Sequence, residues 1–331
     1  MTRSTGLSSV TEAQATTLRR QNSVRGFLYI GTAALLWGLS ASMGRAAFTG
    51  RMLPRSGIRD VTPLILTQCR TGFSFVAVAI AMTFRRGIKG LSVPRIDFVK
   101  LFLLGLGGVA ASNYFYYLAI QRTNVATAII VQYTAPVWVL LYMVARGSER
   151  LTAMKTASVL LSITGIALVI GLIGHSRIEL DVLGVVAALI AAFSFSYYNI
   201  GGHALLARYD RWVVLLYTTL AASLFWIVVN PPNKILAAHY SASTWLFLAV
   251  FSLVSVLLPF TFYFAGLERL VPTKAVIASC LEPVFSVLIA ALALNESVGP
   301  LQTLGIAMVL GAIVLAQRPG TDTHAIAGLV D

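Results

Sequence analysis

Charged side chains are scarce in this sequence. Lys, Arg, Asp and Glu make up 11% of the 331 residues, whereas a soluble domain has about 25%. Apolar residues make up 57% of the chain. This composition excludes an ordinary water-soluble protein and predicts an integral membrane protein that is surrounded by the lipid bilayer.

Cysteine and histidine are also rare, and their positions suggest no reactive site. Cys69 and Cys280 lie inside apolar runs without the spacing of metal ligands, which favours buried free thiols. The four histidines are scattered, no cluster of His, Asp and Glu shares a helix face, and no ATP-binding motif is present. We therefore expect no metal site, no cofactor and no enzymatic activity.

Long apolar runs account for most of the chain. A helix needs about 20 apolar residues to cross a bilayer. We expect an all-α membrane protein with ten such helices, near 26–48, 62–84, 98–119, 123–146, 152–174, 181–207, 212–230, 243–267, 271–294 and 298–317. Short linkers join them, such as 146–150 and 230–233. The tails 1–25 and 318–331 complete the chain.

The net charge of +13 fits membrane topology better than a nucleic-acid partner. Assigning the linkers to alternate sides puts 17 basic residues on one side and 7 on the other. Cytoplasmic loops are enriched in Lys and Arg. We therefore expect a multi-pass protein of the inner or plasma membrane with both termini in the cytoplasm. Four arginines run against this trend: Arg45, Arg51, Arg55 and Arg59.

A pattern recurs in this chain at an offset of 147 residues. Tyr116, Arg122, Ala128, Pro136, Val137, Leu141 and Glu149 correspond to Tyr263, Arg269, Ala275, Pro283, Val284, Leu288 and Glu296. Each copy lies in a five-helix unit, 26–174 or 181–317. Because five is odd, the second unit enters the membrane from the opposite side. The sequence thus predicts an inverted repeat, an architecture of secondary carriers whose substrate site lies near the midplane.

Several motifs in both halves resemble the EamA family of the drug/metabolite transporter superfamily. In the first half these are Trp37-Gly38, Pro63, Arg70, the run from Tyr116 to Ile120, Pro136, the run from Glu149 to Leu151, and Gly165. In the second half they are the run from Tyr263 to Leu267, Leu281-Glu282-Pro283-Val284, Asn295-Glu296, Gly305 and Gly311. The resemblance implies ten helices, cytoplasmic termini and transport of small polar metabolites, often the export of amino acids. Gly165 and Gly311 are one residue out of the repeat register.

Three prolines are expected to kink their helices: Pro136, Pro259 and Pro283. A proline inside a helix frees the carbonyl four residues earlier. For Pro136 and Pro283 these carbonyls belong to Gln132 and Ser279, which are equivalent in the repeat. Such carbonyls are tolerated where protein or a water-filled cavity satisfies them, so both residues are candidates for a substrate cavity. Pro259 corresponds to Ser112, so we expect it to bend its helix more than the equivalent helix is bent.

Glu282 lies near the middle of the predicted helix 271–294, where an acid costs roughly 2.5–3.5 kcal/mol. It corresponds to Ala135, so the repeat breaks there. Glu282 is a candidate for substrate binding or for carrying a coupling proton; the alternative is an acid that braces the Pro283 kink. For Arg70 we favour a structural role, bonding carbonyls of a neighbouring helix, over substrate contact. For Glu149 and Glu296 we favour helix capping.

The remaining cavity candidates are aromatic and polar residues within predicted spans. They are Trp37, Ser40, Asn113, Tyr117, Tyr198, Asn199 and Tyr263. The alternative for Tyr117 and Tyr263 is a place in the interfacial aromatic belt. Aromatic walls with a few amides and hydroxyls suit small amphipathic solutes such as amino acids.

We expect a secondary active or facilitative carrier that works by alternating access, with export as the expected direction. Glycines at 105, 107, 108, 165, 305 and 311 would permit close helix packing. The alternatives are an uptake carrier of the same fold, a channel or a non-transporting membrane protein. The sequence is compatible with a monomer or a homodimer, and a small-molecule substrate is the expected partner.

Overall fold

The computed structural model describes residues 4–48, 61–87, 92–123, 125–172, 181–294 and 297–317. All regular structure in these ranges is helical. The α-helices are α1 (Ser4–Phe48), α2 (Pro63–Arg86), α3 (Arg95–Leu104), α4 (Ala111–Arg122), α5 (Val125–Gln132), α6 (Ala135–Ala145), α7 (Ala153–Val169), α8 (Val182–Leu206), α9 (Arg211–Val229), α10 (Pro232–Leu236), α11 (Ala242–Ser252), α12 (Leu258–Leu267), α13 (Pro272–Ser279), α14 (Leu281–Leu294) and α15 (Pro300–Gln317). Two π-helical segments join α3 to α4 and α11 to α12: η3 (Gly105–Ala110) and η4 (Leu253–Leu257).

The helices are long and apolar enough to cross a bilayer. Within the described ranges, nine spans meet this criterion, and α7 is a tenth, shorter apolar helix of 17 residues. The outer surface is apolar, because Phe84 and Leu292 are each 88% exposed while many serines and threonines are buried. This is the opposite of a soluble protein, and it shows an all-helical, multi-pass membrane protein.

Local sequence signals set most helix ends. The side chains of Thr62, Thr152, Asp181, Asp210 and Ser241 each accept a backbone N–H bond at the start of a helix. Two helices, α6 and α7, end in Schellman motifs in which Gly147 and Gly171 adopt positive φ angles of 69° and 72°. Glycine enters this conformation without a Cβ clash.

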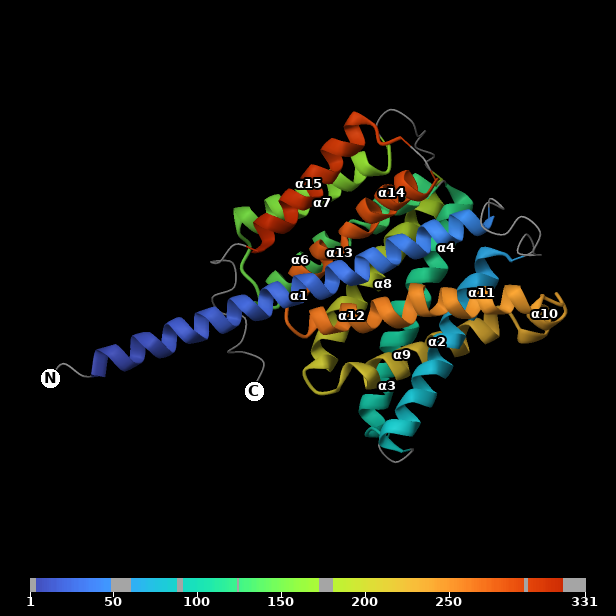
Figure 1. The fold of residues 1–331 in the computed structure, drawn as a ribbon, viewed down its shortest axis with the longest axis horizontal. Coiled ribbons are helices and arrows are strands. Elements are labelled where there is room, and N and C mark those ends of the chain that lie inside the picture. Colours follow the sequence, from blue (N-terminus) through green and yellow to red (C-terminus); the bar gives the residue numbers. More distant parts are fainter. Residues whose placement is uncertain are drawn as a thin grey trace.

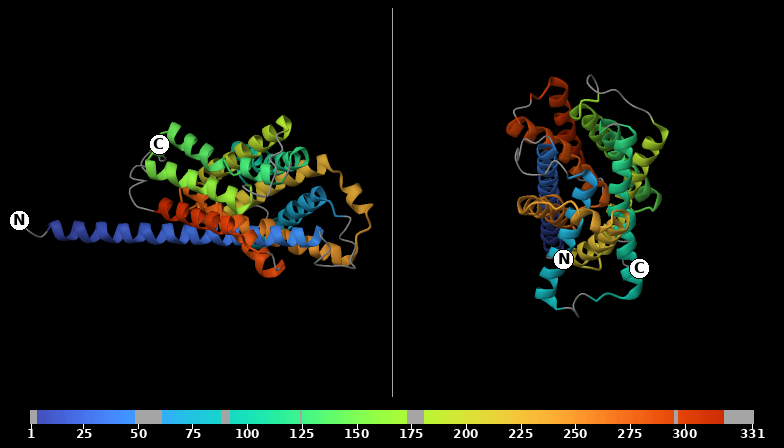
Figure 2. Two further views of the ribbon diagram at one scale, coloured as in Figure 1. Left: turned by 90° about the horizontal axis from the view of Figure 1, so that it is seen from above. Right: turned by 90° about the vertical axis from the view of Figure 1, so that its right-hand side faces the viewer.

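Several predicted boundaries differ from the structure. The span predicted at 152–174 ends at Val169, because the Schellman motif at Gly171 stops the helix. The helix predicted to begin at 26 begins at Ser4, and its N-terminal part projects from the bundle (Figures 1 and 2). Part of the predicted 230–233 turn opens the short helix α10, since Pro232 fits the first helical turn. Arg51, Arg55, Arg59 and Glu296 lie outside the described residues.

Element starts recur at the repeat offset. The helix pairs α3 and α11, α5 and α13, and α7 and α15 each begin 147 residues apart. The ends of α5 and α13, at Gln132 and Ser279, are also 147 residues apart. The π-helical segments η3 and η4 occupy overlapping positions under the same offset. The repeat found in the sequence is therefore also present in the positions of the helix starts and of the π-helical segments.

Polar contacts close the two ends of the bundle. At one end Arg86 pairs with Asp210 at 3.2 Å, Arg211 pairs with Glu268 at 3.6 Å, and the Tyr209 hydroxyl donates to Asp97 at 2.5 Å. This bond to Asp97 raises the pKa of Tyr209 above its usual value. At the other end the buried side chains of Gln68 and Asn230 join α2 to the end of α9.

Candidate functional site

Two interrupted helices carry the candidate site. In the first half α5 ends at Gln132 and α6 begins at Ala135, next to Pro136. In the second half α13 ends at Ser279 and α14 begins at Leu281, with Glu282 in its first turn and Pro283 after it. A proline cannot donate to the preceding turn, so each break leaves backbone carbonyls without their usual helical partner inside the bundle.

The span α3–α4 in the first half and the span α11–α12 in the second half are both irregular. The segment η4 directly precedes α12, in which Pro259 is the second residue. However, η3 lies at the equivalent place in the other half, where no proline occurs. Pro259 and its equivalent Ser112 each lie two residues after a π-helical segment, so the greater bend expected at Pro259 stays a prediction.

A glycine brings α1 against the turn that holds Glu282. A Cβ atom added at Gly38 would lie 2.8 Å from the Ser286 backbone nitrogen and 3.1 Å from the Glu282 carbonyl oxygen. Only glycine permits this approach without a shift of one helix. The approach fixes the position of Glu282 relative to α1.

Partly accessible polar residues from four interrupted or neighbouring helices form one connected group around Glu282. We call it the Arg70–Glu282 cluster, and it contains Thr67, Arg70, Asn113, Tyr116, Tyr117, Tyr133 and Glu282. Thr67 is buried and the others keep partial access.

Hydrogen bonds and one ring contact connect the cluster members on α2 and α4. Arg70 donates from Nη2 to the Asn113 side-chain oxygen at 2.6 Å, and Thr67 donates to the Tyr117 hydroxyl at 2.8 Å. The Tyr116 and Tyr117 rings lie 5.9 Å apart between centroids.

Tyr133 and Tyr116 connect these residues to the Glu282 carboxyl group. The Tyr133 hydroxyl is within hydrogen-bonding reach of the Glu282 carboxyl. The charges of both Arg70 and Glu282 act on the Tyr116 hydroxyl. A base and an acid therefore both lie near the same group of tyrosines.

The contacts of Arg70 differ from our expectation. We expected it to bond backbone carbonyls of a neighbouring helix, but its described hydrogen bond goes to the side chain of Asn113 on α4. Its Nε atom is buried without a hydrogen-bond partner in the described part of the chain. Asn113 is held in place because its own amide donates to the Val109 carbonyl at 2.7 Å.

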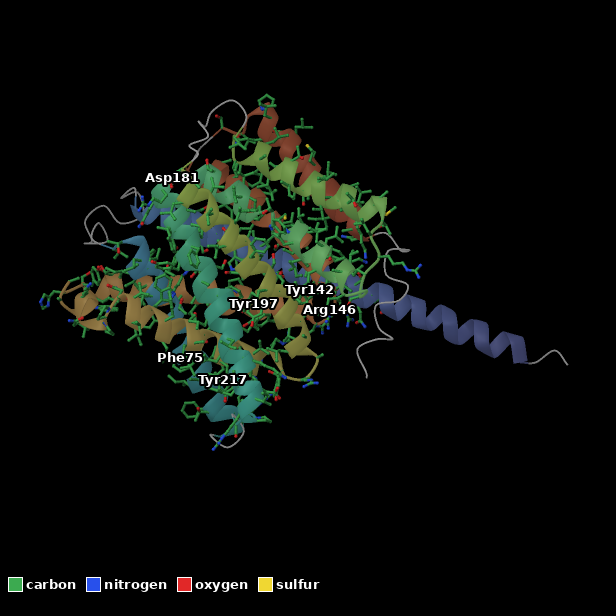
Figure 3. The ribbon with its side chains drawn as sticks, turned by 180° about the vertical axis from the view of Figure 1, so that it is seen from behind. Phe75, Tyr142, Arg146, Asp181, Tyr197 and Tyr217 are labelled. Atoms are coloured by element: carbon green, nitrogen blue, oxygen red, sulfur yellow. The ribbon has the colours of Figure 1, made fainter. Side chains whose placement is uncertain are left out.

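Four other candidates form a closely packed aromatic group. The Trp37 ring lies 5.3 Å from the ring of Tyr263, whose hydroxyl donates to Asn199. The Tyr198 ring packs against both Phe260 and Phe264, while its neighbour Tyr197, labelled in Figure 3, is 44% exposed. Trp37, Tyr198, Asn199 and Tyr263 are all buried. Tyr263 and Asn199 bond each other, and the rings of Trp37, Tyr198 and Tyr263 pack against neighbouring aromatic side chains.

The remaining candidates make local contacts. Ser40 donates to the Trp37 carbonyl at 2.9 Å, and Ser279 donates to the Val276 carbonyl at 2.8 Å. Gln132 is partly accessible at the end of α5. The candidates selected from the sequence include members of both groups, because the sequence pattern does not separate the accessible cluster from the packed one.

The capping role expected for Glu149 was wrong. Thr152 is the N-cap of α7, and Glu149 instead pairs with Lys155 at 2.6 Å. The Lys155 side chain is 4% exposed and that of Glu149 is fully buried. Thr152 is closer to the first turn of the helix and bonds it directly, which leaves the acid free to pair with the lysine.

A cavity of about 240 Å³ lies elsewhere, between α1, α7, α14 and the start of α15. Ser42, Ser286 and Gln302 are among the polar residues that line it. None of the residues selected from the sequence lines this cavity. No residue of the Arg70–Glu282 cluster lines it, although Ser286 is one helical turn from Glu282.

The candidates selected from the sequence did not include three members of the cluster: Thr67, Tyr116 and Tyr133. A signal existed for Tyr133, because it lies in the break before Pro136 and corresponds to Cys280 in the repeat. Tyr116 belongs to the repeat pattern and to the family motifs, which mark it without indicating a place in the cluster. Thr67 and Arg70 are three apart and share a face of α2.

Known proteins resemble this chain over most of its length. The model of the EamA-like transporter family matches residues 24–171 and 182–317. The inner membrane transporter YicL of Salmonella typhimurium is 24% identical over 88% of this chain and 94% of its own. The threonine/homoserine exporter RhtA of Escherichia coli is 26% identical, covering 87% and 90%.

Two further comparisons agree with these matches. The aromatic amino acid exporter YddG of Ancylobacter novellus is 26% identical over 86% of this chain and 94% of its own. A crystal structure with 24% identity superposes with a TM-score of 0.69 and covers 88% of this chain and 96% of that one.

The matched relatives are transporters and not enzymes, which agrees with the absence of a catalytic cluster in the sequence. The family match covers both halves of the chain, on either side of residues 172–181. The chain belongs to the EamA-like transporter family.

Proposed function

We propose that this protein is a secondary carrier that moves small polar or amphipathic metabolites across the cytoplasmic membrane by alternating access. Its ten helices form two inverted five-helix repeats that rock against each other, and the substrate binds between them. Amino acids or their derivatives are the substrate class, and export is the direction. The names of the relatives RhtA and YddG, both amino acid exporters, support this substrate class and direction.

One observation carries the proposal. Two equivalent helices break at Gln132 and Ser279, and an acid, Glu282, follows only the second break. Interrupted helices near the midplane of a repeat protein are typical of carrier binding sites, because the freed backbone groups and the acid can face a substrate there.

Counterflow tests this function. Purified full-length protein in liposomes, preloaded with an unlabelled amino acid, should accumulate the same labelled amino acid from outside, because a carrier exchanges substrate across one site. A panel of the amino acids would identify the best substrate. Labelled solute that equilibrates without stimulation by internal substrate would indicate a channel and contradict the proposal.

A further inference from the structure

We propose that Arg70 and Glu282 hold the two charged ends of a zwitterionic amino acid. The Arg70 guanidinium binds the substrate carboxylate, and the Glu282 carboxylate binds the substrate ammonium. This assignment rests on the carrier function proposed above and specifies which residues bind the two ends of the substrate.

Arg70 has donors available for a carboxylate. A guanidinium has five N–H donors in a planar fork that matches a carboxylate. The described contacts use Nη2 for Asn113, while Nε is buried and without a hydrogen-bond partner in the described ranges. A buried charged donor without a partner is costly. A substrate carboxylate would satisfy it.

Glu282 and Arg70 are close without being bonded to each other. The two charges interact, yet the ion pairs found among the described residues do not include a direct pair between them. An acid and a base are therefore electrostatic neighbours without a direct ion pair in the described part of the chain. An α-amino acid carries its own opposite charges a few bonds apart, so it can pair with both.

Energetics favour a bridging ligand over two solvated charges. An acid and a base within a membrane are expensive, and they persist where they pair with each other or line a substrate path. A zwitterion brings no net charge into the bundle and neutralises both residues. A simple cation or a simple anion would leave one of them unpaired.

Three tyrosines lie beside these two charged residues. Tyr116 feels the charges of both Arg70 and Glu282, and Tyr133 lies within hydrogen-bonding reach of Glu282. The Tyr117 ring is tilted by 52° against the Tyr116 ring, and its hydroxyl accepts from Thr67. Aromatic rings with hydroxyl groups can contact the apolar part of a side chain while the two charged residues orient the backbone end of the substrate.

The test uses counterflow with the amino acid that the panel identifies, together with two analogues of it. One analogue has the carboxylate replaced by hydrogen, and the other has the ammonium replaced by hydrogen. In the wild type each analogue should compete about 30-fold more weakly or worse, because each leaves one buried charge unpaired.

The variants assign each charged end to one residue. In Arg70→Gln the preference for the zwitterion over the carboxylate-free analogue should fall toward onefold, while the preference over the ammonium-free analogue remains. Glu282→Gln should show the reverse. Arg70→Lys keeps the positive charge for folding and should retain part of the carboxylate preference. A merely structural role would lower both preferences together.

Matched controls remove the same charges elsewhere. Arg86→Gln and Glu268→Gln change residues that pair at the end of the bundle and should keep wild-type preferences. Exchange of the intact amino acid that survives in Glu282→Gln, with loss only of flux driven by a pH gradient, would assign proton coupling to Glu282 and overturn the proposal. Counterflow restricted to solutes without a zwitterion would overturn it and leave the carrier function standing. Absence of counterflow for every amino acid would instead reject the proposed function.

Discussion

Individual polar residues in this bundle have two kinds of surroundings. Asn199 and Tyr263 satisfy each other in a closely packed aromatic group. Arg70 and Glu282 keep partial access and lack a direct pair with each other in the described chain. Their composition alone does not distinguish the two groups, because both combine tyrosines with amides. Packing distinguishes them, because one group is buried and the other is partly accessible. We therefore expect the substrate to bind at the Arg70–Glu282 cluster.

Glu149 and Lys155 allow a prediction at the residue scale. Replacing one member leaves the other buried and unpaired, so Lys155→Met should lower the free energy of unfolding by about 3–5 kcal/mol. The double variant Glu149→Gln with Lys155→Met should lose less, because no uncompensated charge remains. Titration of the purified protein with denaturing detergent, followed by circular dichroism, measures both values. Equal losses in the single and double variants would show that the pair does not act as a unit.

Helix packing is the main feature at the scale of elements. The helices α7 and α15 lie along each other (Figure 1), with their glycines in contact. A Cβ atom at Gly305 would lie 2.6 Å from the Gly165 carbonyl oxygen, whereas one at Gly311 would meet only the end of the Leu161 side chain, at 3.3 Å. The sequence paired Gly165 with Gly311 by repeat position, but Gly165 packs against Gly305, because facing helices are neighbours in space and not in the repeat.

This contact predicts an asymmetry between two glycines of one helix. Gly305→Ala should destabilise the protein by about 1–3 kcal/mol, because backbone on α7 must move. Gly311→Ala should change the stability by roughly 0.5 kcal/mol or less, since a flexible side chain can give way. Thermal unfolding of the two purified variants in the same detergent compares them. Equal unfolding temperatures would contradict the close approach of α7 and α15.

The arrangement of the two halves belongs to the scale of the whole molecule. Equivalent helices begin 147 residues apart, so Ser92 and Ser241 lie in exposed linkers just before equivalent helices, α3 and α11. In an inverted repeat these equivalent linkers face opposite sides of the membrane. In a parallel repeat they face the same side.

Labelling of intact cells distinguishes the two topologies. In a background with Cys69 and Cys280 replaced by serine, a membrane-impermeant maleimide should label Ser241→Cys before lysis. It should label Ser92→Cys only after lysis, because the positive-inside distribution places that linker in the cytoplasm. Labelling of both in intact cells would contradict the inverted arrangement, and labelling of Ser92→Cys alone would reverse the predicted orientation.

The sequence by itself determined the class of the molecule, its family motifs and its breaks. Low charge and long apolar runs require a helical membrane protein, because backbone groups in lipid must bond internally. Pro136 and Pro283 predicted where two helices are interrupted, since proline acts on its own chain. These effects are local, because each depends only on residues that are close in the sequence.

Only the tertiary structure decided which distant residues meet. Arg70 reaches Asn113 across 43 positions, and Tyr133 lies within reach of Glu282 although the two belong to different halves. The Glu149 carboxylate forms an ion pair with Lys155 and does not cap the start of α7. Such pairings depend on how helices cross and which faces they turn to each other, which local sequence does not specify.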